Sequence, residues 1–187
     1  ASERLWIDVV VHNAPGQNGI ASDWAETACE GDRIALMGAG GGYAPRREAD
    51  LHILIGDHAT VPAIAAALEA MQPGARGYAL IHVDDEADVL SLTRPEGVVV
   101  SWVSGPRENL LTAVEAVDVP PASIENRSVH VFCHAERGLT KRLRSHLVRE
   151  RGIAREDISI SAYWALGRVE DRFQAEKREA IGRIDPD

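Results

Sequence analysis

After residue 50, short runs of β-branched and aliphatic residues alternate with segments that repeat hydrophobic residues at the helical period. Such alternation is typical of βαβ units, in which helices cover both faces of a parallel sheet. The predicted fold is therefore α/β, with a five-stranded, parallel, doubly wound domain. Its strands are expected at residues 51–55, 78–83, 98–103, 129–133 and 158–161, with helices at 61–71, 108–116 and 136–151.

The first 45 residues do not share this alternation. Residues 5–12 and 33–37 are expected to form strands, and Ser22 is expected to cap a helix that begins at Asp23. Two strands and one helix fit the end of an antiparallel neighbour better than another βαβ unit. The charged segment 170–181 is expected to form a terminal helix. The predicted domains are residues 1–46, 47–168 and 169–187.

Charge and cysteine content exclude several classes of protein. The formal net charge of −9 argues against nucleic-acid binding, which depends on basic residues that contact phosphates. Cys29 and Cys133 form no Cys-x-x-Cys pair and the histidines show no metal-ligand spacing, so neither a disulfide framework nor a metal site is expected. No apolar run approaches the roughly 20 residues that span a bilayer, and no signal peptide is evident, so a cytoplasmic protein is expected. The start, which lacks an initiator methionine, is expected to be a fragment boundary.

The ligand-binding loops of a parallel sheet lie at the carboxyl ends of its strands. The strongest candidate is segment 56–62, where a strand ends in Gly56 and a helix begins near Pro62. Free amides at a helix start suit phosphate oxygens, but the segment also fits a tight turn capped by Asp57 or Thr60. A second candidate, residues 19–22, has the same two interpretations.

Three further segments carry weaker signals. The glycine run at 38–42 fits a phosphate cradle or, as we prefer, a flexible crossing between domains. Tyr163 and Trp164, expected just after the last strand, could stack on a flat ring or cover the sheet edge. The acidic residues 84–86 could bind a ribose hydroxyl or form a solvated turn. No Gly-x-Ser-x-Gly elbow is present, so a hydrolase lacks its best signal.

In their order and spacing, these segments resemble the siderophore-interacting protein family, a branch of the ferredoxin-reductase-like flavoproteins. The resemblance covers nearly the whole chain and rests on the ordered set rather than on any one motif. The matching positions are His12 and residues 19–25, 38–45, 54–64, 135–136, 163–167 and 176–178.

The resemblance implies the last strands and helix of an antiparallel flavin-binding barrel in residues 1–46, an NAD(P)H-binding domain in 47–168 and a C-terminal helix or tail in 169–187. It implies an enzyme that transfers a hydride from NADH or NADPH to FAD, and then single electrons to Fe(III) held by a siderophore. The Fe(II) released would serve iron assimilation. Because the cofactor carries the chemistry, no catalytic side chain is expected.

The resemblance also assigns residues to each ligand. FAD would be held by His12, Gly19, Ala21, Ser22, Trp24, Tyr163 and Trp164. The nicotinamide nucleotide would contact Gly56, Asp57, Thr60, Pro62 and Glu136. The ferric siderophore, an anionic small-molecule substrate, would pair with Lys177 and Arg178.

Two features depart from the family pattern. The Arg-x-Tyr-(Thr/Ser) flavin motif has no match in this chain, so we expect FAD binding to require association with a missing N-terminal barrel portion. His58 stands where the family usually has an acidic residue. For the coenzyme, residues 84–86 favour NADH by repelling a 2′-phosphate, and Arg107 could offset them.

Two alternatives to the ferric-siderophore reductase remain open. One is a non-enzymatic siderophore- or nucleotide-binding module. The other is a ferredoxin-reductase-like enzyme with a different electron acceptor. The nucleotide-binding half of such an enzyme would look much the same.

Overall fold

The structure is a computed structural model that describes residues 7, 9, 11, 20–35, 42–117 and 128–184. The chain forms two compact units, residues 1–42 and 43–187. The parallel sheet lies in the second unit. The finer domain limits predicted at residues 46 and 168 stay predictions.

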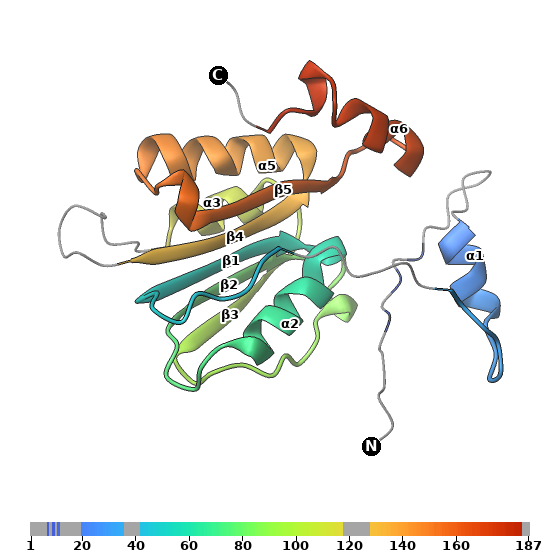
Figure 1. Cartoon of the computed structure of the whole chain (residues 1–187), viewed down its shortest axis with the longest axis horizontal. Helices are drawn as coiled ribbons and strands as arrows, with labels where there is room; N and C mark the ends of the chain where they lie inside the picture. Colours follow the sequence, from blue (N-terminus) through green and yellow to red (C-terminus); the bar gives the residue numbers. More distant parts are fainter. Residues whose placement is uncertain are drawn as a thin grey trace. The chain divides into compact units, whose positions relative to one another are not determined.

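Five parallel strands form the sheet, as predicted (Figure 1). They are β1 (Leu51–Asp57), β2 (Gly77–His82), β3 (Val98–Val103), β4 (Val129–Glu136) and β5 (Ile158–Trp164), in the spatial order β3-β2-β1-β4-β5. β1 is the central strand and is buried at every position after Leu51, as expected for a strand with covered faces. The strand order reverses between β1 and β4, and a doubly wound sheet forms its ligand crevice at such a reversal.

Helices cover both faces of the sheet (Figure 1). α2 (Val61–Ala70) packs against one face, and α3 (Asn109–Glu115) and α5 (Arg137–Arg144) pack against the other. Alternate residues of β1 supply the two cores, because Leu54 packs with α2 whereas Ile53 and Ile55 pack with α3 and α5. A π-helical segment, Ser145–Glu150, continues α5, so the predicted helix at 136–151 is confirmed. Short 3-10 turns lie at His58–Thr60, Glu86–Asp88, Arg155–Asp157 and Ala180–Gly182.

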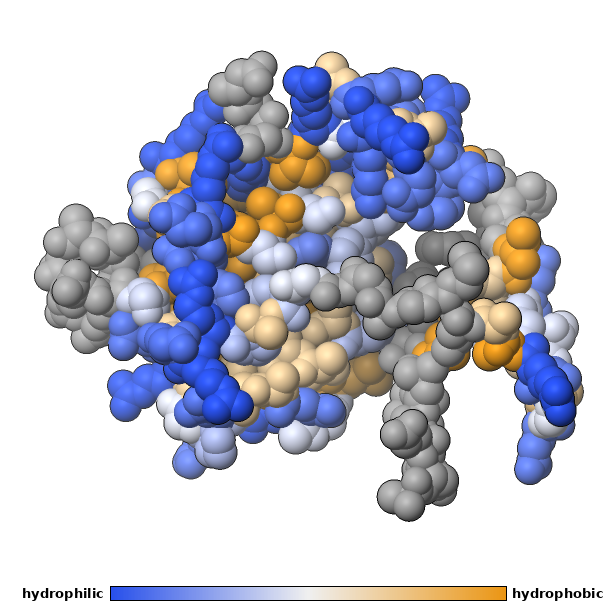
Figure 2. All heavy atoms as spheres, in the orientation of Figure 1, coloured by the Kyte–Doolittle hydropathy of each residue, from blue (hydrophilic) through white to orange (hydrophobic). Residues whose placement is uncertain are grey.

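The hydropathy of the surface differs between the margins of the view and α2. Figure 2 shows hydrophilic residues along the margins of the view and weakly hydrophobic residues over α2, which is rich in alanine.

Pro62 lies in the first turn of α2, where its missing N–H breaks no helical hydrogen bond.

The carboxyl ends of β4 and β5 correct the sequence prediction. β4 runs to Glu136 and β5 to Trp164, beyond the predicted ends at 133 and 161. The two strands stay paired past their hydrophobic runs, with Ala135 opposite Ala162 and Glu136 opposite Trp164. Tyr163 and Trp164 are therefore the last residues of β5 rather than the start of a loop.

The C-terminal segment forms α6 (Glu170–Glu176) and then a 3-10 turn, where one helix over 170–181 was predicted. The turn folds back onto the end of α6. A Cβ atom at Gly182 would collide with the backbone of Glu176 and Lys177, so this close approach requires glycine.

A buried carboxylate attaches this segment to the sheet domain. Glu176 is 6% exposed and accepts hydrogen bonds from Arg137 Nη1 at 2.6 Å, Arg168 Nε at 2.7 Å and Arg172 Nε at 3.0 Å. Only the Arg172–Glu176 pair has the i,i+4 spacing that a sequence can reveal. Arg137 lies 39 residues away, at the start of α5.

This attachment should depend on pH. The hydrogen bond from Arg137, with those from Arg168 and Arg172, lowers the pKa of Glu176 from 4.5 to about 2. Because the folded state has the lower pKa, the stabilisation is complete above pH 4.5 and is lost as the pH falls towards 2. Melting temperature should therefore fall more steeply across this window in the wild type than in Glu176→Gln. Glu179→Gln, which changes an exposed neighbour, should behave like the wild type, and parallel curves for all three proteins would contradict the prediction.

In the first unit, α1 (Ile20–Thr27) is the regular element among the described residues. The helix begins before Ser22, which lies buried in its first turn, so the prediction that Ser22 caps the helix is wrong. Residues 33–35 of the predicted strand 33–37 have no strand pairing. Most of the predicted strand 5–12 and residues 38–41 of the glycine run lie outside the described residues.

Candidate functional site

The ends of four strands meet at the carboxyl edge of the sheet. Asp57, His82, Glu136 and Trp164 are the last residues of β1, β2, β4 and β5. A small cavity of about 10 Å³ lies among them. It is lined by Asp57, His58, His82, Asp84, Arg107, Glu136, Leu139 and Trp164.

Asp57 joins three of these strands through one carboxylate. Its Oδ2 atom accepts hydrogen bonds from the backbone N–H of Glu136 and from the indole Nε1–H of Trp164, each at 2.8 Å. Its Oδ1 atom accepts from the backbone N–H of Ala59 at 3.1 Å. The residue is 3% exposed, and burial raises its pKa against the opposing effect of the bond from Trp164. Asp57 is thus held by donors of the protein itself and positions the groups around it.

Gly56 and Thr60 shape the turn between β1 and α2. The hydroxyl of Thr60 donates to the carbonyl oxygen of Asp57 at 2.7 Å, and Thr60 is fully buried. A Cβ atom at Gly56 would lie 2.9 Å from both Ile64 Cδ1 and Thr60 Cβ, and closer still to Thr60 Oγ1. These contacts describe a tight, internally bonded turn. A nucleotide contact for Gly56, Thr60 or the exposed Pro62 stays a prediction.

Glu136 caps α5 and holds the chain that follows β5. Its Oε2 atom accepts from the backbone N–H of Leu139 at 3.0 Å, and Oε1 accepts from that of Leu166 at 3.2 Å. Thr140 donates its hydroxyl to the carbonyl oxygen of Glu136 at 2.8 Å. One amide in the first turn of α5, that of Leu139, therefore has a side-chain acceptor. In contrast, the N-cap residue of α2, Thr60, makes no side-chain capping bond, which leaves amides of that first turn without a side-chain acceptor.

The indole ring of Trp164 lies between two side chains at the crevice. The ring of His58 is centred 5.6 Å from it, and the guanidinium carbon of Arg107 lies 5.3 Å from its centroid. The second contact is a cation–π interaction. From the sequence, Arg107 was expected only to act as a charge near a phosphate, because nothing local in the sequence links it to Trp164.

Two histidines complete this edge. His82 donates its Nε2–H to the carbonyl oxygen of Gly105 at 2.8 Å, which joins the end of β2 to the loop after β3. His58 Nδ1 lies 3.9 Å from Asp84 Oδ2, and the Asp84 side chain is 74% exposed. The acidic segment 84–86 thus borders the cavity through Asp84 alone.

Tyr163 does not join Trp164 at the crevice. Neighbouring residues of a strand point to opposite faces, and Tyr163 makes an edge contact with the ring of His134 at 4.7 Å. Its side chain is partly open to solvent, at 37% exposure. The structure brings only one of these two aromatic residues to the cavity.

Lys177 and Arg178 lie just after α6 and are exposed. The Lys177 ammonium lies 4.6 Å from the centroid of the Phe173 ring. Burial, and then the charge of Lys177, lower the pKa of His134 to about 4.

The predicted FAD residues of the first unit are only partly described. His12 and Gly19 lie outside the described residues. In α1, Ala21 is exposed, Ser22 is buried and Trp24 is half-buried. Within the described ranges, no group of three or more His, Cys, Asp or Glu side chains could hold a metal ion, and no helix is long and apolar enough to cross a bilayer.

A parallel sheet of order 3-2-1-4-5 with polar residues gathered at its switch point defines a doubly wound α/β domain of the nucleotide-binding class. Comparison with known families then places the chain further. The chain belongs to the siderophore-interacting protein family, because the family model "Siderophore-interacting protein" matches residues 49–167. A second model, "Siderophore-interacting FAD-binding domain", matches residues 1–43.

Individual relatives agree with this placement. An uncharacterised protein of Mycobacterium tuberculosis is 41% identical over 96% of this chain, and the chain covers 66% of that protein. The ferric vibriobactin reductase ViuB of Vibrio cholerae is 35% identical over 94% of this chain, which covers 64% of it. The chain therefore spans about two thirds of the length of these relatives.

Solved structures show the same fold. The siderophore-interacting protein SipS from Aeromonas hydrophila has a TM-score of 0.74 and 27% identity, with 90% of this chain and 66% of that chain covered. A siderophore utilization protein from T. fusca has a TM-score of 0.72 and 32% identity, with 86% of this chain and 60% of that chain covered.

Proposed function

We propose that this chain is the nucleotide-binding part of an FAD- and NAD(P)H-dependent ferric-siderophore reductase. The observation that carries the proposal is the crevice at the carboxyl edge, where one buried carboxylate, Asp57, joins β1, β4 and Trp164. The 35% identity to a ferric vibriobactin reductase supports the choice of reaction.

The fit to a dinucleotide is supported by the two helix N-termini that flank the crevice. Glu136 accepts from one amide in the first turn of α5, that of Leu139, whereas the first turn of α2 has no side-chain cap. The amides of α2 are therefore the ones suited to pyrophosphate oxygens. His58, Arg107 and the Trp164 ring would border the nicotinamide, and the cavity of about 10 Å³ must widen to admit it.

When bound, NAD(P)H supplies a hydride to FAD, and the flavin supplies single electrons to the Fe(III) substrate. The side chains of this chain bind and orient these partners, and no side chain is assigned a proton-transfer role. Lys177 and Arg178 would pair with an anionic ferric siderophore. Hard oxygen ligands hold Fe(II) less tightly than Fe(III), so reduction would release the iron. We place the reaction in the cytoplasm.

The FAD site would be completed outside these residues. The chain spans 66% of its mycobacterial relative, and the FAD-binding family model matches only residues 1–43. We therefore propose that Ala21, Ser22 and Trp24 of α1, with His12, Gly19, Tyr163 and Trp164, act together with a further barrel portion.

A flavin titration tests this proposal. The chain and its full-length parent would be titrated with FAD, and flavin absorbance and fluorescence quenching would be followed. Binding by the parent, with NAD(P)H-dependent reduction of a ferric catecholate, is the expected result. If neither protein binds FAD, the reductase proposal fails and a non-enzymatic nucleotide- or siderophore-binding module replaces it. Flavin binding with reduction of ferredoxin or quinone, but not of ferric siderophores, would reassign the electron acceptor.

The coenzyme is expected to be NADH. The segment after β2 carries the carboxylates of Asp84, Asp85, Glu86 and Asp88, which oppose the charge of a 2′-phosphate. Arg107 is engaged over the Trp164 ring. ADP-ribose should bind this chain about tenfold more tightly than its 2′-phosphate, a difference of about 1.4 kcal/mol.

The double variant Asp84→Asn/Glu86→Gln should reduce this preference, as measured by calorimetric titration of both nucleotides. Glu115→Gln, an exposed acid at the end of α3, is the matched control and should leave the ratio unchanged. Tighter binding of the 2′-phosphate by the wild type would show that Arg107 or another cation dominates.

A further inference from the structure

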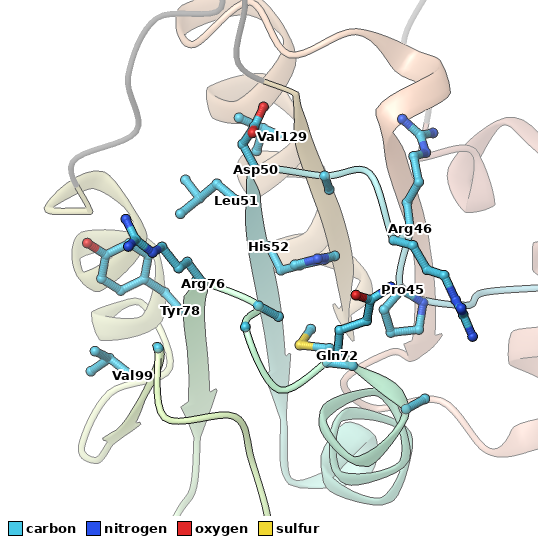
Figure 3. A pocket seen from close by; sticks show the side chains of 18 residues that line it. Pro45, Arg46, Asp50, Leu51, His52, Gln72, Arg76, Tyr78, Val99 and Val129 are labelled. Atoms are coloured by element: carbon cyan, nitrogen blue, oxygen red, sulfur yellow. The ribbon is translucent and has the colours of Figure 1, made fainter.

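A spacious cavity lies at the opposite edge of the sheet from Asp57. It has a volume of about 770 Å³ and lies where β1, β2, β3 and β4 begin (Figure 3). The segment 45–50 before β1 and the loop 70–76 after α2 form its other walls. This volume lies within the range of about 300–1,000 Å³ that small-molecule sites occupy.

Cations outnumber anions along these walls. Arg46, Arg47 and Arg76 line the cavity, against the single carboxylate of Asp50. Asp50 is engaged, because its Oδ2 atom accepts a hydrogen bond from the backbone N–H of Ser128 at 2.8 Å. In a chain of net charge −9, this local excess of guanidinium groups departs from the surface as a whole.

Two of the three arginines have no ion-pair partner among the described residues. Arg46 pairs with Asp157, whereas Arg47 and Arg76 are exposed and form no such pair with the described side chains. A guanidinium group presents several N–H donors in one plane, a geometry that matches carboxylate and phosphate groups. Figure 3 shows Arg76 and Arg46 at opposite ends of the cavity. The two arginines without a described ion-pair partner come from different walls, Arg47 from the segment 45–50 and Arg76 from the loop 70–76, so a ligand that pairs with both has to carry two anionic groups.

A buried histidine in the wall lacks a partner. His52 is 3% exposed and lies between the two ends of the cavity in Figure 3. Its Nδ1 atom has no hydrogen-bond partner among the described residues. A buried polar atom without a partner destabilises a protein, and such atoms mark places where water or a ligand completes the structure. Burial, and then the neighbouring His130, lower the pKa of His52, so its ring is neutral near pH 7.

We propose that this amino-edge cavity binds an organic anion that carries at least two carboxylate or phosphate groups. Arg76 engages one group, Arg47 and the adjoining segment engage the other, and His52 forms the floor. The site is separate from the dinucleotide crevice, because ligands of that crevice bind beyond the opposite ends of the same strands. It does not depend on the proposed reductase activity.

Citrate and inorganic pyrophosphate are suitable probes, one for each anion chemistry. Each would be titrated calorimetrically into the 187-residue chain at low salt. Saturable binding of either probe is expected, and the tighter of the two identifies the preferred group. Arg76→Ala should weaken it about tenfold, since a charge-assisted bidentate pair is lost. Arg142→Ala, which removes an exposed guanidinium from α5, is the matched control and should change the affinity less than twofold, about 0.4 kcal/mol.

Amide NMR shifts locate the binding. Gly74, Gly77 and His52 should shift with the probe, whereas Asp57 and Glu136 at the other edge should not. Absence of saturable binding tighter than about 1 mM for both probes would overturn the proposal. So would equal weakening by Arg76→Ala and Arg142→Ala, or shifts confined to Asp57 and Glu136. These outcomes leave the reductase proposal intact, since it is tested by flavin binding.

Discussion

Replacing Gly56 with alanine is expected to lower the free energy of unfolding by about 3 kcal/mol. The new methyl group would overlap the Oγ1 atom of Thr60, well inside van der Waals contact, and would lie 2.9 Å from the Cδ1 atom of Ile64. Neither neighbour can move freely, because both are fully buried and the Thr60 hydroxyl is bonded to the carbonyl oxygen of Asp57. The clash should therefore displace the start of α2 from the end of β1.

Gly74 provides the matched control for this substitution. A Cβ atom there would have no neighbour within 4 Å. Gly74→Ala should therefore change the stability by less than about 1 kcal/mol. Urea unfolding of both variants measures the difference. Equal stability of the two variants would mean that the β1–α2 turn relaxes around the added methyl group.

Gly56 fits two different local structures. A glycine at the end of a strand was interpreted as room for a ligand to approach the backbone, with a tight turn as the alternative. The space next to Gly56 is filled by the side chain of Thr60. The sequence could not decide between these interpretations, because both require glycine at the same position.

The strands were predictable where burial dictates the residue type. β1 and β3 were expected from runs of hydrophobic residues in which His52 and Ser101 are single interruptions, and β3 has the predicted bounds, Val98–Val103. The end of β4 was not predictable, because the polar residues His134 and Glu136 follow its hydrophobic run while the ladder to β5 continues, and β5 extends to Trp164 with it. Their extension depends on pairing between two strands, which is a property of the sheet and not of either segment.

In the candidate site, the individual residues were predictable from the sequence, but their contacts with one another were not. Asp57, Glu136 and Trp164 were each expected to bind a ligand, but their contacts with one another were not foreseen. Trp164 reaches Asp57 across 107 residues of sequence, and Glu136 reaches it across 79. Contacts of this kind arise only when the order of parallel strands brings their ends together.

Because Asp57 accepts hydrogen bonds from both Glu136 and Trp164, its replacement is the second substitution with a large expected effect. Replacing Asp57 with alanine should lower the free energy of unfolding by about 3 kcal/mol, because the buried N–H of Glu136 and the part-buried indole N–H of Trp164 each lose their acceptor. Part of this loss is offset, since the variant no longer has to bury a carboxylate whose pKa burial raises. Nucleotide affinity should fall as well, because the Trp164 ring loses the bond that orients it.

A double-mutant cycle with Trp164→Phe isolates the bond between the two side chains. Phenylalanine keeps an aromatic ring between His58 and Arg107 but has no N–H to donate to Asp57. If Asp57 acts by orienting Trp164, the stability losses should be non-additive, with a coupling energy of about 1–2 kcal/mol by urea unfolding. The ADP-ribose affinity of the Asp57→Ala variant should then be no lower when Trp164→Phe is added. Additive losses in both measurements would instead mean that Asp57 supports the crevice through the Glu136 backbone alone.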